Sequence, residues 1–164
     1  MIHHVSFNAR DPEQVALGLA QLVGARAVRA PQPPFPSGSW FVAYGDEQGT
    51  LIEVLPWSRT LDPEVSNGLG HDPEMRAHSG THLLLQTSLS TEAVHGIARL
   101  HGWRTLSASA GFFSFTKVWI EGTFLVEIMT AEQAKEYVAT FSRTGIGALD
   151  GKLRWIESAL TNVR

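Results

Sequence analysis

HVSFNARDPEQVALGLAQLVGAR, residues 4–26, and HLLLQTSLSTEAVHGIARLHGWR, residues 82–104, are two versions of one pattern, aligned without a gap at an offset of 78 residues. Between the identical positions, several aligned pairs are chemically similar, as Phe7 is to Leu85 and Asn8 to Gln86. The identical pairs are His4/His82, Gly18/Gly96, Ala20/Ala98, Leu22/Leu100, Gly24/Gly102 and Arg26/Arg104. Self-similarity over such a length indicates an internal duplication.

Both copies predict the same local structure. Residues 5–8 and 83–86 are short apolar runs of strand length. Asp11-Pro12 in the first copy and Ser90-Thr91-Glu92 in the second are typical of helix starts, and apolar residues then recur at helical spacing. Gly24 and Gly102 suit the left-handed residue that ends a helix. Each copy therefore predicts a strand, a helix, a glycine stop and a further strand.

A second pair of segments extends the duplication. Residues 51–55, LIEVL, resemble residues 125–129, LVEIM, at an offset of 74, and the extra loop at residues 31–38 accounts for the change in offset. Aromatic-rich runs at residues 40–44 and 113–119, each followed by a glycine turn, precede these segments as in a β-hairpin. Each half is thus predicted to be a βαβββ module, which makes the fold class α+β.

We expect a single domain over residues 1–164. Its parts are a first module (1–57), a linking loop (58–79), a second module (80–130) and a helical tail (131–164). The loop, rich in Pro, Gly, Asn and Ser, is expected to be mobile and near the cleft, with His71 or His78 able to approach substrate. The tail repeats apolar residues at helical spacing, namely Ala134, Val138 and Phe141, then Leu149, Leu153, Ile156 and Leu160. The second of these sets must be buried, either on a sheet of the same chain or on another subunit. We expect a homodimer.

Composition excludes several classes of function. The net charge is −3 and charges of both signs are dispersed, so neither nucleic acid nor a membrane surface is an expected partner. The chain has no cysteine, which rules out disulfides, thiolate metal sites and a cysteine nucleophile. The N-terminal residues lack the features of a signal peptide, and no apolar run is long enough to cross a membrane, so we expect a cytoplasmic protein.

Four polar residues occupy corresponding places in the two modules. His4 and His82 lie in the first strands, and Glu53 and Glu127 lie in the last, each among mainly apolar neighbours. Singly, a strand histidine is more often a hydrogen-bonded structural residue, and a strand glutamate more often faces solvent. As a duplicated set, two imidazoles and two carboxylates suit one divalent cation: Zn, Ni, Co, Mn or Fe. His3 should face the opposite side of the sheet and is interpreted as structural.

This arrangement of His4, Glu53, His82 and Glu127 resembles the ligand pattern of glyoxalase I, within the vicinal oxygen chelate superfamily. The resemblance covers residues 1–57 and 80–130. It implies two tandem βαβββ modules around a partly open, barrel-like cleft that holds one metal ion. It also implies a lyase or isomerase that acts on a small substrate with vicinal oxygens, by metal-stabilised enediolate proton transfer. Glu127 is the first candidate for the base, and Glu53 is the second.

Other branches of the superfamily fit the sequence less well. Extradiol dioxygenases need a histidine on the third strand of one module, and residues 112–121 contain none. Methylmalonyl-CoA epimerases usually have glutamine where this chain has Glu53. The main alternative is a metal-free ligand-binding or antibiotic-sequestering protein of the bleomycin-resistance type, in which the ligand positions are typically replaced. An interaction protein that assembles through its C-terminal helices is a third hypothesis.

Alternation along the strands predicts which other residues share the face of the four ligands. Substrate-binding candidates on this face are Ser6, Asn8, Gln86 and Met129, whereas its leucines at 51, 55, 84 and 125 are interpreted as core. The resulting pocket should be mostly apolar. Arg26 and Arg29 are candidates for gripping a substrate carboxylate, although solvated strand-edge charges are the preferred interpretation.

Overall fold

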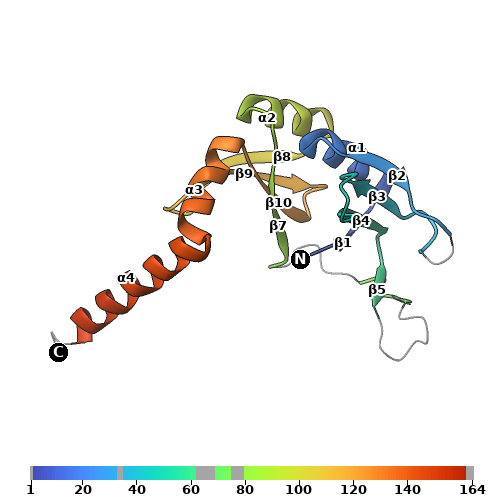
Figure 1. The fold of residues 1–164 in the computed structure, drawn as a ribbon. Coiled ribbons are helices and arrows are strands. Elements are labelled where there is room, and N and C mark those ends of the chain that lie inside the picture. Colours follow the sequence, from blue (N-terminus) through green and yellow to red (C-terminus); the bar gives the residue numbers. More distant parts are fainter. Residues whose placement is uncertain (1, 33–34, 62–68, 75–79, 162–164) are drawn as a thin grey trace.

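A computed structural model describes residues 2–32, 35–61, 69–74 and 80–161 of the chain. It shows two four-stranded mixed sheets that do not close into a barrel, two helices lying beside them, and a helical tail (Figure 1). The predicted α+β class and the duplication into βαβββ modules are confirmed. No helix in the described ranges is long and apolar enough to cross a membrane.

The first module contains one helix and four strands. They are β1 (His4–Ala9), α1 (Pro12–Val23), β2 (Arg26–Arg29), β3 (Trp40–Ala43) and β4 (Leu51–Pro56). The strand order is β1-β4-β3-β2; β1 runs parallel to β4, and the other neighbours are antiparallel. The side chain of Asp11 accepts a hydrogen bond from the amide of Gln14 at the start of α1, and Gly24 ends the helix at φ +69°. Both signals were predicted from the sequence.

The second module has the same topology. It contains β7 (His82–Gln86), α2 (Thr91–Leu100), β8 (Arg104–Ser109), β9 (Ser114–Ile120) and β10 (Phe124–Met129), with strand order β7-β10-β9-β8. Ser90 caps α2 by accepting a hydrogen bond from the amide of Ala93, and Gly102 follows the helix at φ +69°. The register matches that of the first module, because β7 pairs in parallel with β10.

The two modules share one hydrophobic core on the helix-facing sides of both sheets. The indole of Trp103, from the second module, lies directly on Gly18 of α1, where a Cβ atom would come within 2.3 Å of it. Phe7 and Phe124 stack between the modules with their ring centroids 4.2 Å apart. The carboxylate of Glu121 accepts hydrogen bonds from the backbone amides of Arg10 and Asp11 just before α1. These contacts make the modules a single unit.

The segment between the modules differs from the predicted linking loop. It contains a two-stranded antiparallel hairpin of β5 (Arg59–Leu61) and β6 (Leu69–His71). Asn8 of β1 anchors this hairpin, because its amide nitrogen donates to the carbonyls of Pro56 and Arg59, at 3.0 and 2.7 Å. The two strands pair with each other inside the segment, and the side chain of Asn8 ties the start of β5 to β1.

The tail forms α3 (Ala131–Phe141) and α4 (Arg143–Thr161). The helix α3 packs on the second sheet through Ala134, Tyr137 and Phe141, which meet Phe113, Phe115, Met129 and Leu84. Val138, which the sequence grouped with Ala134 and Phe141, is instead exposed, because positions 134, 137 and 141 share the buried side of the helix. The helix α4 runs away from the body of the molecule (Figure 1).

The close approach at Gly18 gives a first prediction, with a control supplied by the duplication. Gly18→Ala should lower the free energy of unfolding by about 1–3 kcal/mol, because the added methyl group displaces the buried Trp103 ring. Gly96, the corresponding residue of α2, has open space at its Cβ position. Gly96→Ala should therefore leave stability unchanged or raise it by up to about 1 kcal/mol, since alanine favours the helix.

Urea denaturation of both variants measures these two effects. Equal effects of the two substitutions would contradict the proposed role of the Trp103–Gly18 contact.

Candidate metal centre

His82 and Glu127 form one pair on the open face of the second sheet. Register places the two strands side by side, and the Nε2 atom of His82 lies 3.8 Å from Oε2 of Glu127. The Nδ1 atom of His82 lies 3.0 Å from the carbonyl oxygen of Gly80. Since a carbonyl only accepts hydrogen bonds, Nδ1 donates to Gly80, and Nε2 is the ring nitrogen that faces Glu127. Metal-binding imidazoles are commonly oriented by such a backbone hydrogen bond.

Glu53 occupies the corresponding place in the first module, beside Ser6 rather than beside a histidine. Its side chain is buried, with 7% of the residue exposed, and Oε2 accepts a hydrogen bond of 2.7 Å from the hydroxyl of Ser6. One neutral donor compensates only part of the cost of burying a carboxylate. His4 lies on the same face, two positions along β1 from Ser6, and is exposed. A cation bound here would offset the charge of Glu53.

We call His82 with Glu127, and His4 with Glu53, the two half-sites, one in each module; the structure places the side chains of the first pair 3.8 Å apart. Across the described ranges, no group of three or more histidine, aspartate or glutamate side chains is placed to hold a metal ion. The helix-facing sides of the sheets form the common core, so both ligand faces point away from it. A single site made of all four residues stays a prediction.

The predicted substrate-binding residues have different environments. Register confirms that Ser6, Asn8, Gln86 and Met129 share the faces of the ligands. The Asn8 amide is engaged by backbone carbonyls, and Met129 is almost completely buried beneath α3. Gln86 is exposed at the end of β7. Of the four, Ser6 has a hydrogen bond to a predicted ligand, Glu53.

Lys117 is a residue of this face that the sequence analysis missed. It is directly opposite Glu127 in the β9–β10 ladder, half-buried, with its ammonium nitrogen 5.9 Å from the centre of the Phe115 ring. Trp119 and Arg104, which pair with each other on β9 and β8, lie on the same face. The hairpin register, which depends on the turn at Glu121 and Gly122, could have revealed Lys117. The face is consequently more basic than the predicted apolar pocket and suits a substrate with anionic oxygens.

The remaining histidines of interest do not join either half-site. His71 lies on β6, exposed, with Nδ1 3.1 Å from the hydroxyl of Ser58. His78 lies outside the described residues. The Nδ1 atom of His3 is 2.9 Å from the carbonyl oxygen of Gln48, which fits its interpretation as a structural residue.

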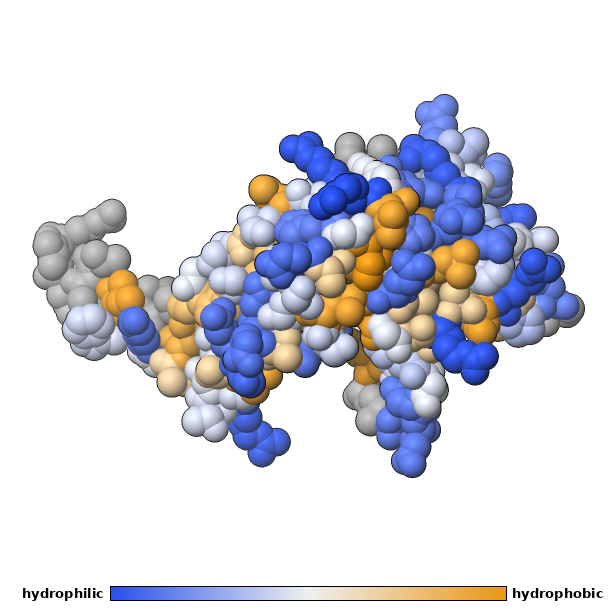
Figure 2. All heavy atoms as spheres, turned by 90° about the horizontal axis from the view of Figure 1, so that it is seen from above, coloured by the Kyte–Doolittle hydropathy of each residue, from blue (hydrophilic) through white to orange (hydrophobic). Residues whose placement is uncertain are grey.

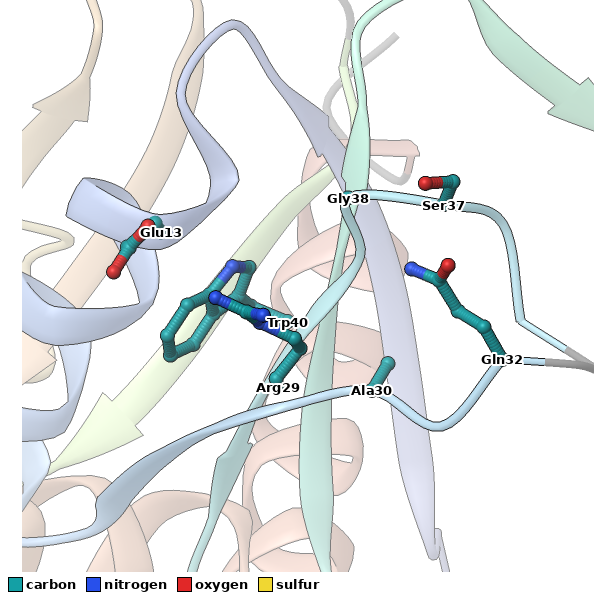
Figure 3. A pocket seen from close by; sticks show the side chains of 7 residues that line it. All are labelled: Glu13, Arg29, Ala30, Gln32, Ser37, Gly38 and Trp40. Atoms are coloured by element: carbon teal, nitrogen blue, oxygen red, sulfur yellow. The ribbon is translucent and has the colours of Figure 1, made fainter.

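A separate cavity of about 510 Å³ lies beside the start of α1, on the helix side of the first sheet (Figure 3). It contains none of the predicted ligands; its lining residues are Glu13, Arg29, Ala30, Gln32, Ser37, Gly38 and Trp40. Arg29 lies over the indole of Trp40 here, 5.6 Å from the ring centre. Arg29 is thus on the opposite face from Glu53 and cannot grip a substrate there, whereas Arg26 is on the ligand face and exposed.

Comparison with solved structures identifies the fold. The chain matches the fosfomycin resistance protein FosX from Mesorhizobium loti with a TM-score of 0.51 and 14% identity, over 84% of this chain and 96% of that one. It also matches a mutant of FosX from Listeria monocytogenes, in complex with Mn(II) and 1S,2S-dihydroxypropylphosphonic acid. That match has a TM-score of 0.52 and 14% identity, over 81% and 93% of the two chains. The chain has the fold of the vicinal oxygen chelate superfamily.

Sequence comparison adds no narrower assignment. No protein-family model matches the chain, and no curated protein matches it. The solved structures are covered almost completely, whereas about a fifth of this chain has no counterpart in them. Fold alone does not determine activity, so the function must be argued from the two half-sites.

The position of Asn8 gives a prediction that separates anchoring from substrate binding. Asn8→Ala should lower the free energy of unfolding by about 1–3 kcal/mol without any ligand present, because two partly buried carbonyls lose their donor. Gln86, its counterpart in the duplication, is exposed, and Gln86→Ala should change stability by no more than about 0.5 kcal/mol. Thermal denaturation measures both; a stable Asn8→Ala variant would argue against the anchor.

Proposed function

We propose that this protein is a metal-dependent, glyoxalase-like enzyme, a lyase or isomerase, that acts on a small substrate with vicinal oxygens. The observation that carries the proposal is the orientation of His82, whose Nδ1 is engaged by Gly80 while Nε2 points to the side of Glu127. The duplication repeats both residue types at His4 and Glu53. Zn, Ni, Co, Mn and Fe all suit this set of nitrogen and oxygen donors.

The donor atoms fit a divalent cation. Both carboxylates are largely buried, so each needs a compensating positive charge, and neither has an arginine or lysine in an ion pair among the described residues. A bound cation would supply Lewis acidity toward two neighbouring substrate oxygens. The complex of FosX with Mn(II) and a compound with adjacent hydroxyl groups agrees with this class of ligand.

The reaction assigned to the chain itself is proton transfer between adjacent carbons of the substrate. Glu127 is proposed as the base that removes a proton from one carbon and returns it to the next, with Glu53 as the second candidate. Glu127 is better placed, because its carboxylate is opposite Lys117 and beside Trp119 on a face that can hold an organic anion. Lys117 would bind anionic oxygen of the substrate.

The half-sites are proposed to meet between two copies of the chain. Within one copy, the shared core directs both ligand faces outward, and each face holds half of the predicted set. A twofold homodimer would bring His4 and Glu53 of one copy to His82 and Glu127 of the other, twice. Such an arrangement also covers Val28, which is exposed on the same face of the first sheet as Glu53.

Removal of metal gives the primary test. A chelator should lower the melting temperature by about 5–10 °C, which corresponds to a site occupied at roughly a hundred times its dissociation constant. A divalent ion should restore it. His82→Ala should remove the response and leave a folded protein, because the histidine is half exposed and contributes little to the core.

His101→Ala provides a matched control, since His101 contacts Gln21 and Trp103 far from either half-site. A melting temperature that does not respond to chelator or added ions would favour the metal-free binding protein instead.

Subunit complementation tests whether the site is shared. Neither the His4→Ala nor the His82→Ala homodimer should hold metal normally, because every site lacks one imidazole. A mixed dimer of the two variants has one site with both histidines and one with neither. Metal analysis of the mixed dimer, isolated with two different affinity tags, should therefore recover half of the wild-type content. No recovery would place each site within a single chain.

A further inference from the structure

The helix α4 extends from the molecule as an arm, and α3 is the element it packs against within the described residues (Figure 1). Its nineteen residues include three glycines, at positions 145, 147 and 151. Gly145 is required where α4 approaches α3, since a Cβ atom there would lie 2.2 Å from the carbonyl oxygen of Ala139. Gly147 and Gly151 have open space around them and only weaken the helix. A helix of this composition needs a packed face in order to be stable.

The sequence of α4 defines that face. Apolar residues occur with alternating spacings of three and four residues, which is the pattern of positions a and d in a coiled coil: Ile146, Leu149, Leu153, Ile156 and Leu160. In the structure Ile146 and Ile156 are 46% and 37% exposed, whereas the side chains of Leu153 and Leu160 lie outside the described residues. Figure 2 shows hydrophobic atoms exposed along the arm.

The charges beside the apolar positions indicate what covers them. In this heptad register Lys152 is at position g, and Glu157, five residues later, is at position e of the following heptad. These two positions meet between the strands of a parallel two-stranded coiled coil, where opposite charges attract. Lys152 of one helix would therefore meet Glu157 of an identical helix that is parallel to it and in the same register. By the same rules Ile146 at a with Leu149 at d favours two strands, whereas Leu153 at a with Ile156 at d favours a larger number, so the charged pair and not the a and d residues carries the choice of partner.

The accessible surface of the chain can be compared with the area that a homodimer buries. The whole chain exposes 10490 Å². A compact protein of 18.0 kDa is expected to expose about 8,000 Å², so the excess is roughly 2,400 Å². Obligate homodimers bury about 1,000–2,500 Å² on each partner. The excess, which is spread over the whole chain, is comparable with the surface that one partner of such a homodimer buries.

From these observations we propose that α4 pairs with α4 of a second copy as a short parallel coiled coil that holds the homodimer together. The inference concerns the dimer and does not depend on the metal chemistry proposed above. The row of a and d side chains, called the seam, of one helix faces the seam of the other across the twofold axis. Gly147 and Gly151 lie on the outer side of the pair, where no neighbour is needed. Each copy thereby covers the apolar stripe that the other exposes.

Charge at the seam gives the first test. Wild-type protein at high micromolar concentration should sediment with twice the 18.0 kDa mass of one chain. In protein freed of metal by a chelator, Ile156→Asp, which places a carboxylate at a d position, should halve the sedimenting mass. Ser158→Asp places the same charge at position f, on the exposed outer side, and should leave the dimer intact. Circular dichroism checks that both variants keep the folded domain.

Cross-linking tests the register, because the chain has no cysteine of its own. In a parallel pair, position 156 of one copy faces position 156 of the other. Ile156→Cys treated with diamide should then form a covalent dimer, while Ser158→Cys should stay a monomer on a denaturing gel.

A monomeric wild type, a larger oligomer, a dimeric Ile156→Asp variant or equal cross-linking at both positions would each overturn the proposal. Loss of metal binding with an intact dimer would contradict the proposed function alone.

Discussion

The packing of Trp103 against Gly18 is the constraint on which the arrangement of the molecule depends. It joins the helix-facing side of one module to that of the other, and the Phe7–Phe124 stack continues the same core. Because one side of each sheet is used to join the modules, the other sides remain for function. Both His–Glu faces are then directed away from the core.

The faces that carry the predicted ligands differ between the two modules in which elements cover them. In the second module, α3 covers one end of the sheet with Ala134, Tyr137 and Phe141, so that Met129 becomes part of a core. The ligand pair His82 and Glu127 lies beyond this cover, beside basic and aromatic residues. In the first module, Val28 is exposed on the same face as the buried Glu53. Glu127 lies opposite Lys117, whereas Glu53 accepts a hydrogen bond from Ser6, so the two glutamates have different surroundings.

In a single chain, the buried charge of Glu53 and the exposed apolar side chains of α4 both cost free energy. Glu53 has one neutral donor, and α4 exposes isoleucines and Trp155. A carboxylate favours a cation, and an apolar stripe favours another apolar stripe. Both costs would fall on dimerisation with metal bound. The cavity beside Arg29 and Trp40 takes no part in this balance, because it lies on the other side of the first sheet.

The sequence by itself determined the duplication, the caps of α1 and α2, the glycine stops and the strand faces, because all of these follow local periodicity or a repeat. It also identified His82 and Glu127 as neighbours. Only the tertiary structure decided three further features. Asn8 anchors a hairpin, Arg29 lies on the face of the first sheet opposite Glu53, and Lys117 is opposite Glu127 in the second sheet. These features depend on strand register and on contacts between residues far apart in the chain. Spacing along one segment carries no information about either.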